Sequence, residues 1–147
     1  MSKQPLEIGV GFFGHKTIDY DRDKMRNALK RGGLSIRAAA RRLVSRRAIS
    51  SPGEFPGMVS GTLKRAIAVT GYGSGGGWIR VGVKTIRGKK FYPIFLLRGT
   101  VERRTKKLRY SGRVEPRDDY IGAAAKAKRS AVRSMVQSEL KNALIPR

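Results

Sequence analysis

The chain has 147 residues, of which 33 are Lys or Arg and 10 are Asp or Glu, so its formal net charge is +23. It has no cysteine, which excludes disulfides and thiolate metal sites. Hydrophobic residues make up 39% of the chain, enough for the core of one domain, and we expect residues 1–147 to form a single domain.

The charge imbalance is informative about partners rather than about fold. Nucleic acid, an anionic membrane surface or an acidic protein could each neutralise it. The N-terminus has no apolar run of signal-peptide length, and no segment approaches the roughly 18 apolar residues of a membrane span. The sequence therefore predicts a soluble intracellular protein, or a component of a particle assembled in a cytoplasm.

The first third of the chain predicts a strand and a long helix. Residues 6–13 favour a strand, and the helical pattern covers 23–47, with Asp21 or Asp23 as its N-terminal cap. The pair Gly32 and Gly33 predicts either a kink or the close approach of another backbone. One apolar stripe is formed by Met25, Leu29, Gly32, Ile36, Ala39, Ala40 and Leu43, and Lys30, Arg37 and Arg41 are expected on the far side.

The middle of the chain predicts a short helical turn and a β-hairpin. Prolines and glycines end the first helix in 49–67, where Ser60 is a candidate cap for a turn that carries Leu63 and Ile67. Residues 66–73 and 78–84 alternate as strands do, and the glycine-rich link between them favours a flexible turn over a phosphate-binding loop.

An apolar segment, "FYPIFLLRGT" at 91–100, follows among basic residues. Its Pro93 favours a helix start or an edge strand over a central strand. The next stretch, 101–117, is polar and basic, and we expect it to form a long loop.

A second long helix is predicted from about 118 to 144, with Asp118 and Asp119 at its start, where negative charge suits the helix dipole. Lys128 and Glu139 interrupt the apolar face, which indicates contact with another chain or with solvent. The apolar face consists of Ile121, Ala125, Val132, Met135, Val136 and Ala143. Together the elements predict an α+β fold in which a small antiparallel β-sheet packs against two long amphipathic helices.

The side-chain inventory does not favour an enzyme. His15 is the only histidine, and its turn-rich surroundings favour a surface position. Asp19, Asp21 and Asp23 alternate, but they lack the glycine and the distal glutamate of a calcium loop. We therefore expect no catalytic residue, no metal and no cofactor.

The basic residues are the candidate interaction site. Residues 102–113 contain one tyrosine among six cations. This composition can bind nucleic-acid phosphates without sequence specificity, or it can bind an acidic protein surface. The expected interaction residues are Arg103, Arg104, Lys106, Lys107, Arg109, Arg113 and Arg117.

The order of these motifs resembles the neck and tail-completion proteins of tailed phages, the family that includes the lambda-type minor tail protein Z and its head-tail joining and tail terminator relatives. The segment "PGMVSGTLKRAI" at 56–67 matches the family's step from the first helix into the hairpin. Pro116 and Arg117 match a Pro-Arg pair ahead of the last helix. The third matching element consists of Tyr92, Phe95, Gly99 and Thr100.

The resemblance implies a structural virion protein at the neck, or at the head-proximal end of the tail, that completes the tail and helps join it to the DNA-filled head. It implies contact with tail tube and head-connector proteins, assembly into a ring such as a hexamer, and a basic loop that meets acidic protein or packaged DNA. It also implies that 91–98 is a short helix under the sheet, with Tyr92, Phe95 and Leu96 in the core.

Two departures from the family pattern concern subunit contacts more than fold. Leu97 and Arg98 replace a glutamate and an aromatic residue, and 118–120 replaces a Phe-Leu pair. The alternative reading, which rests on charge alone, is a non-sequence-specific nucleic-acid-binding protein of the architectural or ribosomal type.

Overall fold

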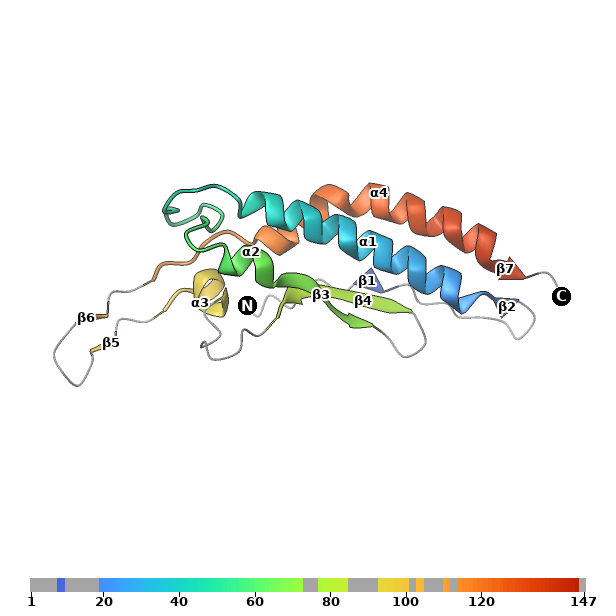
Figure 1. The fold of residues 1–147 in the computed structure, drawn as a ribbon, viewed down its shortest axis with the longest axis horizontal. Coiled ribbons are helices and arrows are strands. Elements are labelled where there is room, and N and C mark those ends of the chain that lie inside the picture. Colours follow the sequence, from blue (N-terminus) through green and yellow to red (C-terminus); the bar gives the residue numbers. More distant parts are fainter. Residues whose placement is uncertain are drawn as a thin grey trace.

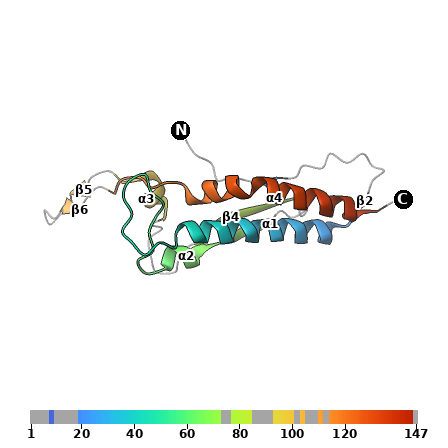
Figure 2. The ribbon, with the colours of Figure 1, turned by 90° about the horizontal axis from the view of Figure 1, so that it is seen from above.

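Two long antiparallel helices lie side by side over a small sheet (Figures 1 and 2). They are α1 (Arg22–Leu43) and α4 (Tyr120–Ala143). The computed structural model describes residues 8–9, 19–72, 77–84, 93–100, 103–104, 110–111 and 114–145. The other elements are β1 (Ile8–Gly9), β2 (Asp19–Tyr20), α2 (Thr62–Ala66), β3 (Ile67–Tyr72), β4 (Trp78–Val83), α3 (Pro93–Arg98), β5 (Arg103–Arg104), β6 (Tyr110–Ser111) and β7 (Leu144–Ile145).

The predicted α+β fold is confirmed. The main sheet is antiparallel with the strand order β1–β4–β3, and α1 lies against its β3–β4 hairpin. A single cluster of buried side chains joins this hairpin to both long helices. β2 and β7 pair separately, through Tyr20 and Leu144, next to the start of α1 and the end of α4.

Local signals set the start of α1, and packing sets its end. The Asp21 carboxylate accepts hydrogen bonds from the N–H groups of Asp23 (3.0 Å) and Lys24 (3.1 Å), so Asp21 is the cap. The predicted apolar stripe is buried or packed against the core. The helix ends at Leu43 rather than near residue 47, because Val44 leaves the helical conformation and its buried side chain joins the core.

Two of the three cations expected on the far side of α1 lie instead at its half-buried flanks. Arg41 is partly buried and donates from Nε (3.2 Å) and Nη2 (2.9 Å) to the carbonyl oxygen of Ile67. Arg37 is half-buried as well, whereas Lys30 is exposed as expected. A long guanidinium stem can lie along apolar surface and carry donors to a carbonyl at the edge of the sheet, so helical position alone misplaced these side chains.

The glycine pair of α1 lies where neighbouring elements approach the helix closely, and it does not produce a kink. The helix runs unbroken from Arg22 to Leu43. A Cβ atom at Gly33 would lie 2.7 Å from Ile79 Cδ1 of the sheet, and one at Gly32 would lie 2.8 Å from Val132 Cγ1 of α4. The two glycines therefore let α1 approach both neighbours, and the approaching atoms are side chains rather than another backbone.

The predicted hairpin is confirmed as β3 and β4, while its link at 73–76 lies outside the described residues. Ile79 and Val81 are buried, whereas Trp78 and Arg80, which alternate with them, are exposed. The guanidinium of Arg80 lies over the Trp78 ring, 5.5 Å from its centroid. One face of the hairpin thus packs on α1 and the other carries polar and aromatic side chains.

The short helical turn exists, but its cap is not Ser60. α2 begins after Gly61, which adopts a left-handed φ of 69° that glycine tolerates best. Ser60 precedes that N-cap residue, and its Oγ accepts a hydrogen bond from the Thr62 N–H at 3.4 Å and hydrogen-bonds the Thr62 hydroxyl at 2.8 Å. Leu63 is buried as expected, and Ile67 already belongs to β3.

The predicted acidic start of α4 contains one cap and one exposed side chain. The Asp119 carboxylate accepts hydrogen bonds from the N–H groups of Ile121 (3.1 Å) and Gly122 (2.9 Å), whereas the Asp118 side chain is exposed. We expect Asp119→Ala to lower the free energy of unfolding by about 1 kcal/mol, because a helical donor loses its partner. Asp118→Ala is the matched control and should leave urea denaturation unchanged; equal losses would contradict the capping role.

Glu139 is paired within the chain. Its carboxylate accepts a hydrogen bond from Arg31 of α1, and its side chain stays 27% exposed, so the pair and partial contact with solvent account for its position on the apolar face. Lys128 is half-buried. Tyr120, absent from the predicted face, is fully buried at the first turn of α4.

Candidate interaction surface

The apolar segment that stood out in the sequence forms α3. Pro93 is its buried first residue, a position where proline fits because its missing N–H has no helical partner. Leu96 and Leu97 pack against the core, but Phe95 is 40% exposed, so its expected core position is wrong. A helix of this length presents one side inward, and Phe95 lies on the other. Tyr92 lies outside the described residues.

Gly99 and Thr100 turn the chain out of α3 and close the base of the next segment. Gly99 has a left-handed φ of 72°, and a Cβ atom there would lie 2.8 Å from the carbonyl oxygen of Val114. The Thr100 N–H donates to that oxygen at 2.8 Å, and Thr100 Oγ1 accepts from the Val114 N–H at 3.0 Å. The chain is therefore held together at Thr100 and Val114, immediately before and after residues 101–113.

Residues 101–113, which we call the basic arm, contain a two-stranded antiparallel ribbon where a loop was expected. β5 pairs with β6 through Arg103 opposite Ser111 and Arg104 opposite Tyr110. This ribbon lies beyond α3, at the end of the molecule opposite β2 and β7 (Figure 1). Of the expected interaction residues in the arm, the described backbone includes Arg103 and Arg104, while Lys106, Lys107, Arg109 and Arg113 lie outside the described residues.

Arg117, the last expected interaction residue, forms hydrogen bonds within the chain. Its Nε donates to Ser50 Oγ at 3.1 Å and its Nη1 to the carbonyl oxygen of Glu115 at 3.2 Å. Its backbone N–H donates to the carbonyl oxygen of Leu96 at 2.7 Å. Arg117 therefore ties the segment after the arm to α3 and to the loop that follows α1.

Further bonds hold that loop, residues 45–61, against the segment after the arm. The Gly53 N–H donates to the carbonyl oxygen of Pro116 at 3.3 Å, and the Asp118 N–H donates to that of Glu54 at 3.0 Å. Inside the loop, a Cβ atom at Gly57 would lie 1.8 Å from the carbonyl oxygen of Ala48. Any side chain at position 57 would clash with this oxygen, so only glycine allows the backbone at Gly57 and Ala48 to approach this closely.

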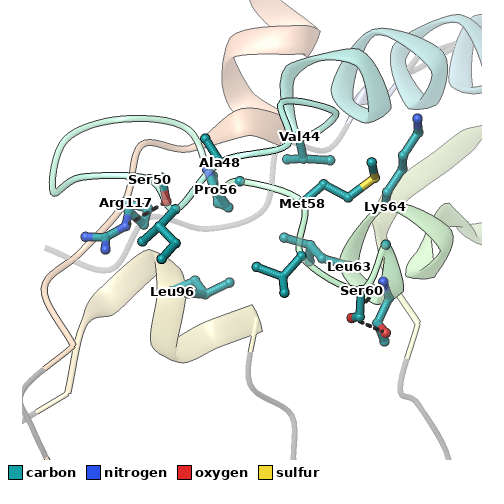
Figure 3. A pocket seen from close by; sticks show the side chains of 15 residues that line it. Val44, Ala48, Ser50, Pro56, Met58, Ser60, Leu63, Lys64, Leu96 and Arg117 are labelled. Carbon is teal, nitrogen blue, oxygen red and sulfur yellow. Dashed lines mark hydrogen bonds between the residues drawn. The ribbon is translucent and has the colours of Figure 1, made fainter.

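A pocket of about 320 Å³ opens where this loop, α2 and α3 meet (Figure 3). Side chains of Val44, Leu63 and Leu96 contribute to an apolar lining, with Lys64 and Arg117 among the lining residues as well. Sequence reasoning missed this site. The only signal was a pair of apolar residues, Ile49 and Val59, in a stretch rich in proline and glycine.

Ile49 and Val59 are highly exposed apolar residues in the lining of this pocket. They are 91% and 88% exposed, the highest values among the large hydrophobic residues that the structure describes as exposed. Both also line a second, adjoining hollow with Arg47 and Arg65. This end of the molecule therefore presents apolar side chains among cations.

The outer face of α4 is a second basic surface. At helical spacing it carries exposed side chains that donate hydrogen bonds, and no carboxylate. The face, which we call the α4 donor face, consists of Lys126, Arg129, Ser130, Arg133, Ser134, Gln137 and Lys141.

The aspartates near α1 are engaged in the helix start. Asp21 caps α1, and Asp23 pairs with Arg26 at 3.5 Å. Within the described ranges, no three His, Cys, Asp or Glu side chains gather as metal ligands, and no helix there is long and apolar enough to span a bilayer. His15 lies outside the described residues.

Comparison with known proteins adds no relative. Neither a scan against protein-family models nor searches of curated proteins and of solved structures return a match to this chain. Its function is therefore argued from the surfaces above and from the order of its motifs.

Proposed function

We propose that the chain is a structural virion protein of a tailed phage, placed at the neck or at the head-proximal end of the tail. There it completes the tail and helps join it to the DNA-filled head, as a tail terminator or head-tail joining protein does. It works as an oligomeric ring, such as a hexamer, between tail tube and connector proteins, and performs no catalysis.

The observation that best supports this proposal is the pair of hydrogen bonds between Thr100 and Val114 at the base of the basic arm. The resemblance implies a short helix, a Gly-Thr turn and then a segment that reaches a neighbouring subunit. In this chain α3 ends at Arg98, and the hydrogen bonds between Thr100 and Val114 fix where the arm leaves the body. An arm held at its base reaches a partner with less entropy to lose than a free loop of the same length.

The positive charge supplies a reason for assembly with anionic partners. A net charge of +23 opposes the packing of copies in a ring until acidic surfaces or DNA phosphates neutralise it. The sequence of the arm is rich in cations, and its described ribbon, β5 and β6, lies at one end of the molecule, where such a surface can be met. The protein would then be found in the virion and, during assembly, in the host cytoplasm.

A nonsense codon placed in the gene within the phage genome tests the proposal. In a non-suppressing host, negative-stain electron microscopy should show filled heads beside unjoined tails, or tails of uncontrolled length. Supplying the intact chain from a plasmid should restore joined particles. Normal joined particles without the protein would overturn the neck assignment.

A second candidate function, non-sequence-specific nucleic-acid binding, is favoured by the α4 donor face. Its cations lie along one face of a single helix, where several of them can contact successive phosphates of a nucleic-acid backbone. Its Ser and Gln side chains can donate hydrogen bonds to phosphate oxygens. A helical surface without carboxylates avoids local repulsion of an anion.

We expect the triple substitution Lys126→Gln, Arg129→Gln and Arg133→Gln to reduce the salt dependence of DNA binding. The slope of log K against log salt should fall by about 0.9 for each phosphate that the variant no longer neutralises. Fluorescence anisotropy with a short labelled duplex measures it. The charge-matched control is Arg22→Gln, Arg26→Gln and Lys30→Gln on α1; equal slopes for both triples would contradict binding through α4.

A further inference from the structure

We propose that the pocket between α2, α3 and the loop after α1 binds a short acidic segment of a partner protein, which places one bulky apolar side chain in the cavity. The inference is independent of the phage assignment. It rests on the shape of the pocket, the exposed apolar side chains that line it and the charges around it.

The shape of the site favours a protein segment over a small ligand. A cavity of about 320 Å³ holds one or two apolar side chains, and it lies at the lower end of ligand pockets, roughly 300–1,000 Å³. Ile49 and Val59 line both this pocket and the adjoining hollow, and both are almost fully exposed. A small ligand held in one hollow leaves part of both side chains uncovered, whereas a chain segment that lies across the two hollows covers them.

The charges select an acidic partner. Lys64 and Arg117 line the pocket, and Arg47 and Arg65 line the adjoining hollow. The carboxylate of the loop, Glu54, is engaged with Arg46 at 3.7 Å and with the Ser51 N–H at 3.0 Å. A second copy of the chain would bring another net charge of +23 to this surface, so charge complementarity favours a carboxylate-rich segment of a different protein.

The site is preformed. Arg117 bonds Ser50 on one wall, and the Met58 N–H donates to the carbonyl oxygen of Arg46 at 2.8 Å on the other. Walls held in this way need little ordering when a partner binds. A hollow with fixed walls also suits an inserted side chain better than a lipid surface, which is contacted by protruding apolar residues.

The probe is a fluorescein-labelled peptide of alternating Asp and Glu around a central Leu-Phe pair, and anisotropy measures its binding. The double variant Ile49→Ser with Val59→Ser should weaken binding about tenfold, the order expected when aliphatic side chains no longer cover the bound segment. Leu144→Ser, an exposed apolar change at the other end of the molecule, should leave it unchanged.

Charge is tested separately. Arg47→Gln with Arg65→Gln should weaken peptide binding about tenfold, since complementary charges beside an apolar contact add affinity of that order. The equally charged control, Arg22→Gln with Lys30→Gln on α1, should retain it. Circular dichroism melting confirms that each variant is folded.

Two outcomes would overturn the inference. A peptide with Ser-Ser in place of Leu-Phe that binds as tightly as the original would mean that net charge alone attracts it. Vesicles of phosphatidylserine and phosphatidylcholine that lose affinity for the Ile49 and Val59 variant, while the peptide does not, would identify a lipid surface instead. Neither result depends on the electron microscopy of virions, so this inference and the neck assignment fail separately.

Discussion

Replacing Gly33 with isoleucine is expected to lower the free energy of unfolding by about 3 kcal/mol, the upper range for overpacking a core. A Cβ atom at this position would lie 2.7 Å from Ile79 Cδ1 and 3.3 Å from Val69 Cγ2, and isoleucine adds further atoms beyond it. Because α1 contacts both the sheet and α4, pushing it away from the hairpin disturbs the entire core. The higher helix propensity of isoleucine, a gain of a few tenths of a kcal/mol, does not offset this loss.

Urea denaturation followed by circular dichroism measures the effect. Ala38→Ile is the matched control, since Ala38 is exposed on the same helix, and its free energy should change by less than about 0.5 kcal/mol. Gly32→Ile should resemble Gly33→Ile, because it meets Val132 of α4 instead of the sheet. A stable Gly33→Ile protein would mean that α1 and the hairpin can move apart without cost.

The elements of the fold follow from local signals and could be predicted. Apolar spacing indicated the two long helices, and acidic residues marked their starts at Asp21 and Asp119. Alternation indicated the hairpin. Each of these signals acts between residues that are close in the sequence, where the backbone geometry of helix or strand decides which side chains share a face.

What could not be predicted depends on contacts between distant segments. Arg41 reaches Ile67 across the packed helix and strand, so its place on the helix indicated the wrong environment. The walls of the pocket depend on two such contacts. The backbone at Gly57 lies close to the Ala48 carbonyl oxygen, and Arg117 donates a hydrogen bond to Ser50. Apolar periodicity in the sequence carries no information on contacts between distant segments. The sequence therefore indicated the basic arm as a candidate site but not the pocket.

The path of the arm is likewise set by a distant contact, between Gly99 and the segment at Val114. Gly99→Ala is expected to destabilise the base of the arm by about 2–3 kcal/mol. Roughly 1–2 kcal/mol of this comes from placing a Cβ atom in a left-handed conformation. The rest comes from contact with the Val114 carbonyl oxygen at 2.8 Å and with Pro116 Cδ at 3.1 Å. The pair of hydrogen bonds between Thr100 and Val114 should then break.

Hydrogen exchange measures this directly, as a loss of protection at the amides of Thr100 and Val114 with α1 and α4 unchanged. Gly53→Ala is a close control, because Gly53 has a φ of 75° but nothing within 4 Å of its added Cβ atom. It should carry the conformational cost without the clash. In the complementation assay we expect Gly99→Ala to leave heads and tails unjoined, whereas Gly53→Ala restores particles. Equal exchange and equal complementation in the two variants would mean that the direction of the arm does not depend on its base, and the neck proposal would lose the observation that carries it.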